Sequence, residues 1–114
     1  MQKRRGFIKV VLGRSPLFFD MFESKLSSYG LPIELKYLSV IESGLRPTVK
    51  SRVGALGLWQ FMYPTGKMYG LKVDSYIDER CNPYKATVAA AEYLKSLTLT
   101  LLPVIEQTIT FPLI

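Results

Sequence analysis

Glu42 is the side chain in this sequence that is best placed to act as a proton donor. It follows Leu38, Val40 and Ile41 near the end of an apolar segment with helical spacing. The negative end of a helix dipole and apolar neighbours both disfavour a charged carboxylate, so a glutamic acid placed there can keep its proton near neutral pH. General acid cleavage of a glycosidic bond requires such a group. The competing interpretation is an ordinary glutamate exposed at a helix end, and position alone favours it.

The composition limits which other catalytic schemes the chain can support. It contains no histidine and a single cysteine, Cys81, among its 114 residues. These counts argue against an internal disulfide, the usual metal sites and every nucleophile that is activated by histidine. Any chemistry must therefore use carboxylates, hydroxyls, amides or lysines, and we expect neither a metal ion nor a cofactor.

Positive charge is concentrated at the amino-terminal end of the chain. The net charge is +6, and five of the fifteen basic residues but none of the nine acidic residues lie in residues 1–14. The rest of the sequence is nearly neutral. Residues 1–14 are expected to form a basic arm that is solvated or partly disordered, in preference to one that contacts an anionic surface. Nucleic acid is not an expected partner.

A single globular domain is the expected organisation, because 114 residues with 48% apolar and 21% charged side chains suit one small core. No run of eighteen apolar residues is present, so no membrane-spanning helix is expected. Lys9 and Arg14 interrupt the apolar stretch near the amino terminus and no small-residue cleavage site follows, which argues against a signal peptide. We expect a monomer.

Two helices are expected to position Glu42. Ser15 and Pro16 are typical of a helix start, and Gly30 is typical of a helix end. Between them, apolar side chains recur at helical spacing at Phe18, Phe22, Leu26 and Tyr29. A second helix is expected from Pro32 to about Gly44, with an apolar surface wide enough to be mostly buried.

The remaining sequence predicts a loop, short helices and one long helix. Residues 45–52 lack periodicity and are expected to form the loop, and residues 54–62 are expected to lead into a short helix that stops near Pro64. Thr65 is expected to cap another short helix. The long helix is expected to start at Asn82 and Pro83, with its apolar stripe at Tyr84, Val88, Ala91 and Leu94 or Leu97. From Leu97 onward, threonine and branched residues carry only one charge in eighteen positions, a composition typical of strands.

An ordered series of motifs resembles the lytic transglycosylases, closest to their membrane-bound D type. The resemblance covers about residues 15–97 and implies a mainly helical fold, the lysozyme-like SLT domain that is related to goose-type lysozyme. The motifs are LPIELKYLSVIES (31–43), PTVKS (47–51), GALGLWQFMYPTG (54–66), YGL (69–71), DER (78–80), NP (82–83) and AAAEYL (89–94).

The resemblance implies roles for five residues. Glu42 matches the family's single catalytic carboxylate. Ser51 and Gln60 match polar residues that line the cleft near the reacting sugar. Met62 matches an apolar wall, and Tyr93 matches a tyrosine beside the catalytic glutamate. Without the resemblance, Met62 and Tyr93 would be interpreted as core residues, and a buried Gln60 would need a hydrogen-bond partner.

The implied reaction is cleavage of the β-1,4 bond between N-acetylmuramic acid and N-acetylglucosamine in peptidoglycan glycan strands. Glu42 would protonate the leaving oxygen, and the substrate's own acetamido group would stabilise the oxocarbenium-like charge. The ionised Glu42 would then accept the proton of the muramyl C6 hydroxyl, which closes a 1,6-anhydro ring without water. The resemblance also implies action in the periplasm or cell envelope.

The resemblance ends before the family's next helix and its Ala-Tyr-Asn motif, which closes the cleft and supports the catalytic glutamate. We therefore expect a basic arm (1–14), a partial transglycosylase domain (15–97) and a divergent tail (98–114) produced by truncation or a shifted reading frame. Three alternatives stay open: a hydrolytic muramidase of the lysozyme type, an inactive fragment that only binds peptidoglycan, and, more distantly, a helical domain that binds nucleic acid through its basic arm.

Overall fold

The computed structural model describes residues 2–110, with side chains for residues 5–101. Four α-helices and two short 3-10 helices make up its regular structure, and no strand occurs within the described range. In chain order they are α1 (Gln2–Ser28), η1 (Ile33–Leu35), α2 (Lys36–Ser43), α3 (Tyr63–Met68), η2 (Glu79–Cys81) and α4 (Pro83–Thr110). The expectation of a mainly helical domain is confirmed.

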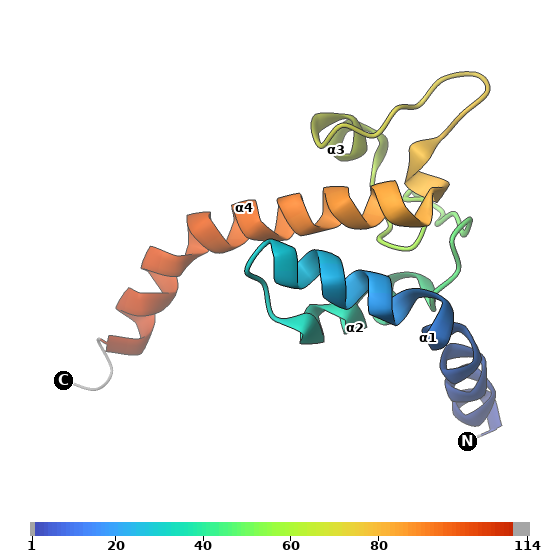
Figure 1. Cartoon of the computed structure of the whole chain (residues 1–114), viewed down its shortest axis with the longest axis horizontal. Helices are drawn as coiled ribbons and strands as arrows, with labels where there is room; N and C mark the ends of the chain where they lie inside the picture. Colours follow the sequence, from blue (N-terminus) through green and yellow to red (C-terminus); the bar gives the residue numbers. More distant parts are fainter. Residues whose placement is uncertain (1, 111–114) are drawn as a thin grey trace.

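The two long helices, α1 and α4, lie side by side and form the body of the domain (Figure 1). The α1 face carries Phe18, Phe22 and Leu26, all buried, as the helical spacing predicts. The amino-terminal part of α4 is rich in small buried residues: Ala86, Ala89, Ala90 and Ala91. Leu26 of α1 packs with Ala91, whereas Ala89 and Ala90 pack with Phe61 and Leu71. Phe18 and Phe22 pack with Leu45 and Leu58, so the core also extends between α1 and the segment that follows α2.

The expected helix start at Ser15 and Pro16 is wrong, because α1 begins at Gln2 and continues through Pro16. Proline has no N–H to donate to the carbonyl of Leu12, and the Ser15 hydroxyl donates to that carbonyl instead, at 3.1 Å. Figure 1 shows α1 changing direction between its amino-terminal part and the part that packs on α4. Residues 2–14 are therefore helical, and most of their described side chains are exposed.

The second helix agrees with the sequence prediction. A 3-10 turn after Pro32 leads into α2, and Gly44, with φ of 60°, ends the helix in the left-handed conformation. Residues 45–52 form a loop, as expected, and the chain contains no helix from there to Met62. The helix expected before Pro64 is absent, because Pro64 lies in the first turn of α3, where a proline needs no N–H partner. Thr65 therefore lies inside α3 and does not cap it.

The carboxy-terminal helix starts where expected, since the Asn82 side chain accepts a hydrogen bond from the Lys85 backbone N–H at 2.9 Å. The strand-like composition after Leu97 is misleading, because α4 continues to Thr110. Within this segment the Thr98 and Thr100 hydroxyls each donate to the carbonyl four residues earlier, at 2.9 Å. Residues 111–114 of the expected strand lie outside the described residues. No helix in the described range is both long and apolar enough to cross a bilayer.

Candidate active site

A cleft of about 230 Å³ opens between α2, the segment that precedes α3, and α4. Its lining is largely apolar and aromatic, with few polar groups, which is typical of ligand sites. The lining residues are Leu38 and Glu42 from α2, Trp59, Gln60, Phe61 and Met62 from the preceding segment, Thr65 from α3, and Ala90, Tyr93 and Leu94 from α4. Three parts of the chain that are distant in sequence therefore meet at one cleft.

Glu42 lies in the last turn of α2 and contributes the one carboxylate among these lining residues. The Ser39 hydroxyl donates to the Leu58 carbonyl at 2.7 Å, and the Ser43 hydroxyl donates to the Ser39 carbonyl at 2.9 Å. Both serines are buried, and the bond to Leu58 holds this turn of α2 against residues 54–61, which we call the cleft segment. The expected apolar enclosure of the carboxylate is not found, because Glu42 is exposed and Ile41 is 78% exposed.

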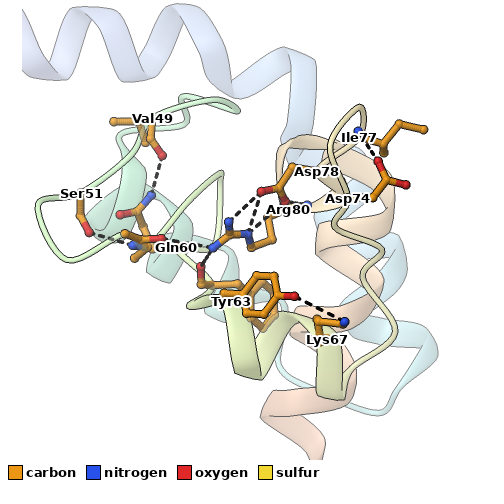
Figure 2. A network of polar contacts seen from close by, with 12 residues as sticks. Val49, Ser51, Gln60, Tyr63, Lys67, Asp74, Ile77, Asp78 and Arg80 are labelled. Carbon is orange, nitrogen blue, oxygen red and sulfur yellow. Dashed lines mark hydrogen bonds and ion pairs between the residues drawn. The ribbon is translucent and has the colours of Figure 1, made fainter.

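Gln60 has the hydrogen-bond partners that a partly buried amide needs. Its Nε2 donates to the Val49 carbonyl at 3.0 Å and to the Gly57 carbonyl at 2.9 Å (Figure 2). Its backbone has a φ of 52°, in the left-handed region that non-glycine residues rarely adopt. The side chain thus holds its own loop in shape while it also lines the cleft.

Ser51 is not among the residues that line the cleft. Its hydroxyl accepts a hydrogen bond from the Ala55 backbone N–H at 3.0 Å, which closes a turn over residues 51–55 (Figure 2). The Ser51 N–H also donates to the Ala55 carbonyl at 2.8 Å. In this structure Ser51 therefore supports the loop beside the cleft.

Met62 and Tyr93 both line the cleft, on the side of α3 and α4. Met62 is 42% exposed, so its side chain is available at the cleft surface. The Tyr93 ring packs edge to face with Phe61 and Tyr69, at centroid distances of 6.3 Å and 5.3 Å. The structure thus brings four of the five expected residues to one cleft.

The cleft also contains residues for which the sequence does not predict a role in the site. Leu38 lies one helical turn before Glu42, and Ala90 and Leu94 lie on either side of Tyr93 along α4. Helical spacing from Glu42 and Tyr93 identifies Leu38 and Ala90, whereas Leu94 directly follows Tyr93 and is not identified in this way. Phe61 and Thr65 lie on a loop and a short helix, where no periodic signal was available.

The ion pair between the buried Arg80 and the partly buried Asp78 should make folding stability depend on pH. Hydrogen bonds from the Arg80 guanidinium lower the pKa of Asp78. A lowered folded-state pKa adds stability above the unfolded-state value of about 3.9, and that stability is lost as pH falls through the folded-state pKa. Urea unfolding should therefore show a progressive loss of stability as the pH falls below about 4.

The Asp78→Asn variant should be less stable at neutral pH and should show a shallower dependence on acid. Asp20→Asn, which changes an exposed carboxylate on α1, is the matched control and should keep the wild-type profile. Equal acid profiles for wild type and Asp78→Asn would show that this ion pair does not contribute to the pH dependence.

The comparison that decides the family covers most of the chain. The sequence model of the Transglycosylase SLT domain matches residues 20–109. The chain belongs to this family. The lysozyme-like SLT fold expected from the motifs is therefore confirmed, and the matched range includes residues 98–109 as well as the segment that carries the motifs.

This SLT domain is also similar to larger curated proteins. It is 27% identical over 95 residues to Membrane-bound lytic murein transglycosylase D of Escherichia coli strain K12, covering 83% of this chain and 21% of that protein. It is 38% identical over 79 residues to Peptidoglycan transglycosylase gp16 of Escherichia phage T7, covering 68% of this chain and 6% of that protein. The chain thus spans about a fifth or less of the length of these relatives.

Proposed function

We propose that this SLT domain cleaves the glycan strands of peptidoglycan as a lytic transglycosylase, with Glu42 as both acid and base. The observation that carries the proposal is the single carboxylate, Glu42, among the residues that line the cleft. The names of the relatives, which include murein and peptidoglycan transglycosylases, support the substrate class. Action in the cell envelope is part of the same proposal.

A single carboxylate suits this reaction better than ordinary glycoside hydrolysis. Most glycoside hydrolases use two carboxyl groups on opposite sides of the scissile bond, whereas substrate-assisted enzymes let an acetamido group replace one of them. Glu42 would first donate its proton to the oxygen of the β-1,4 bond that leaves muramyl C1. It would then accept the proton of the C6 hydroxyl, whose oxygen bonds to C1 and closes the 1,6-anhydro ring.

The rest of the cleft suits a sugar chain. Leu38 and Met62 offer apolar surface to the C–H faces of a sugar ring, and Thr65 and Tyr93 bring hydroxyl groups to the same cleft. Because Glu42 is exposed, water can also reach its carboxyl group. This exposure favours a hydrolytic muramidase as the second candidate.

Product masses distinguish the two candidates. The purified chain is incubated with purified peptidoglycan, and the soluble products are analysed by mass spectrometry in water enriched in oxygen-18. A transglycosylase should release anhydromuramyl ends that are lighter by one water and carry no label. Labelled reducing ends would replace the proposal by the muramidase, and no release of soluble glycan would support a fragment that only binds peptidoglycan.

A further inference from the structure

Arg80 is a buried cation behind the cleft segment. Its side chain is 8% exposed, and it forms an ion pair with Asp78 at 2.7 Å between Nη2 and Oδ2. Nε also donates to the same carboxylate, at 3.0 Å to Oδ1. A guanidinium held in this forked manner has a fixed direction, which the single ammonium group of a lysine does not reproduce.

The third guanidinium nitrogen, Nη1, is bonded to both ends of the cleft segment. Nη1 of Arg80 donates to the carbonyls of Gly54 and Phe61, at 3.1 Å each (Figure 2). Residues 54–61 are thereby closed into a loop by one nitrogen. The loop is also fastened internally, because the Leu56 and Phe61 backbones exchange hydrogen bonds at 3.1 Å and 3.2 Å.

The backbone of Arg80 supports the middle of the same loop. A Cβ atom on Gly57 would lie 2.0 Å from the Arg80 carbonyl oxygen, so the two main chains are in close contact. The opposite side of the loop faces the cleft, where Trp59, Gln60 and Phe61 line its wall. Arg80 itself is not a lining residue.

We propose that Arg80 is a positioning residue that fixes this wall, so that the affinity of the cleft for glycan depends on its guanidinium group. The helix α2, which carries Glu42, is bonded to the loop through Ser39 and the Leu58 carbonyl, but it also packs against α1 and η1, which Arg80 does not hold. Loss of the guanidinium should therefore displace the glycan-binding wall more than the acid. The inference rests on the proposed function, because glycan is its ligand.

The test compares Arg80→Lys and Arg80→Met with wild type and with Lys72→Met. Lys72 is the matched control, since its side chain is 65% exposed and its ion pair with Asp74 spans 3.7 Å. Trp59 is the only tryptophan and lines the cleft, so its fluorescence reports binding of a soluble N-acetylglucosamine tetrasaccharide without any turnover. Turnover on purified peptidoglycan gives KM and kcat separately.

Both Arg80 variants should bind the tetrasaccharide about tenfold more weakly and show a similar rise in KM, with kcat changed less. Lys72→Met should behave as wild type. A merely structural role would reduce the folded fraction, which lowers the binding stoichiometry and kcat but leaves Kd and KM unchanged. Arg80→Lys retains the positive charge, so the result does not depend on whether Arg80→Met folds.

The inference would be overturned if Arg80→Lys kept the wild-type Kd and KM, even if its binding stoichiometry and kcat fell. An Arg80→Lys chain that shows no cooperative melting would also overturn it, because Arg80 would then be required for folding and not for positioning. A wild-type chain that binds the tetrasaccharide without releasing products would overturn the proposed transglycosylase reaction, while the comparison of Kd values would still test Arg80.

Discussion

Replacement of Glu42 by glutamine is expected to reduce the rate at which anhydromuramyl products are released by about 10²- to 10⁴-fold. Glutamine has nearly the same shape but can neither donate the proton to the leaving oxygen nor accept one from the C6 hydroxyl. Because Glu42 is exposed, the substitution neither creates a cavity nor leaves a buried charge without a partner. The melting temperature should therefore stay near that of wild type, and tetrasaccharide binding should remain.

The matched control is Glu34→Gln, the same substitution at an exposed position in η1. Glu34 is not among the residues that line the cleft, so its replacement should leave turnover unchanged. Turnover by Glu42→Gln at the wild-type rate would show that another group supplies the proton. Equal losses in both variants would indicate a general effect of surface charge on contact with peptidoglycan.

The parts of the fold that the sequence predicts well are those with strong local signals. Phe18, Phe22 and Leu26 are buried because they repeat on one side of α1. Gly44 ends α2, and Asn82 caps the start of α4, each through contacts within a few residues. These signals need no knowledge of distant parts of the chain, so they can be identified before the fold is known.

Proline and threonine were misleading for physical reasons. A proline lacks a donor wherever it stands, so Pro64 was consistent with the end of one helix and with the start of the next. Pro16 lies inside α1, where the Ser15 hydroxyl bonds to the carbonyl that the proline leaves without a partner. The hydroxyls of Thr98 and Thr100 bond along α4, which offsets their preference for strands.

The sequence predicts which residues form the candidate site better than it predicts how exposed they are. Glu42, Gln60, Met62 and Tyr93 do meet at one cleft, although Ser51 supports the adjacent loop. The exposure of Glu42 depends on which segments cover the end of α2, and no local pattern encodes that arrangement. The role of Arg80 was equally hidden, because its carbonyl partners lie 26 and 19 residues away and are backbone atoms.

Gly57→Ala should be the most destabilising small substitution in the loop. Gly57 has a φ of 90°, and a Cβ there would lie 2.0 Å from the Arg80 carbonyl oxygen and 2.9 Å from its carbon. The loop cannot easily retreat, since the Gly57 N–H is bonded to the Val49 carbonyl at 2.9 Å and Arg80 holds the loop ends. We expect a loss of more than about 3 kcal/mol, a large part of the roughly 5–15 kcal/mol available to such a domain.

Gly54→Ala separates the two causes of this loss. Gly54 has nearly the same φ, 91°, but a Cβ there would have no atom within 4 Å, so the variant carries the backbone strain without the collision. Its cost should be only about 1–2 kcal/mol. Urea unfolding of both variants measures the difference, which reports the close approach of the loop to Arg80. If both variants lost similar free energies of unfolding, the main chains at Gly57 and Arg80 would be able to move apart at little cost. The loop would then be less rigid than its hydrogen bonds indicate.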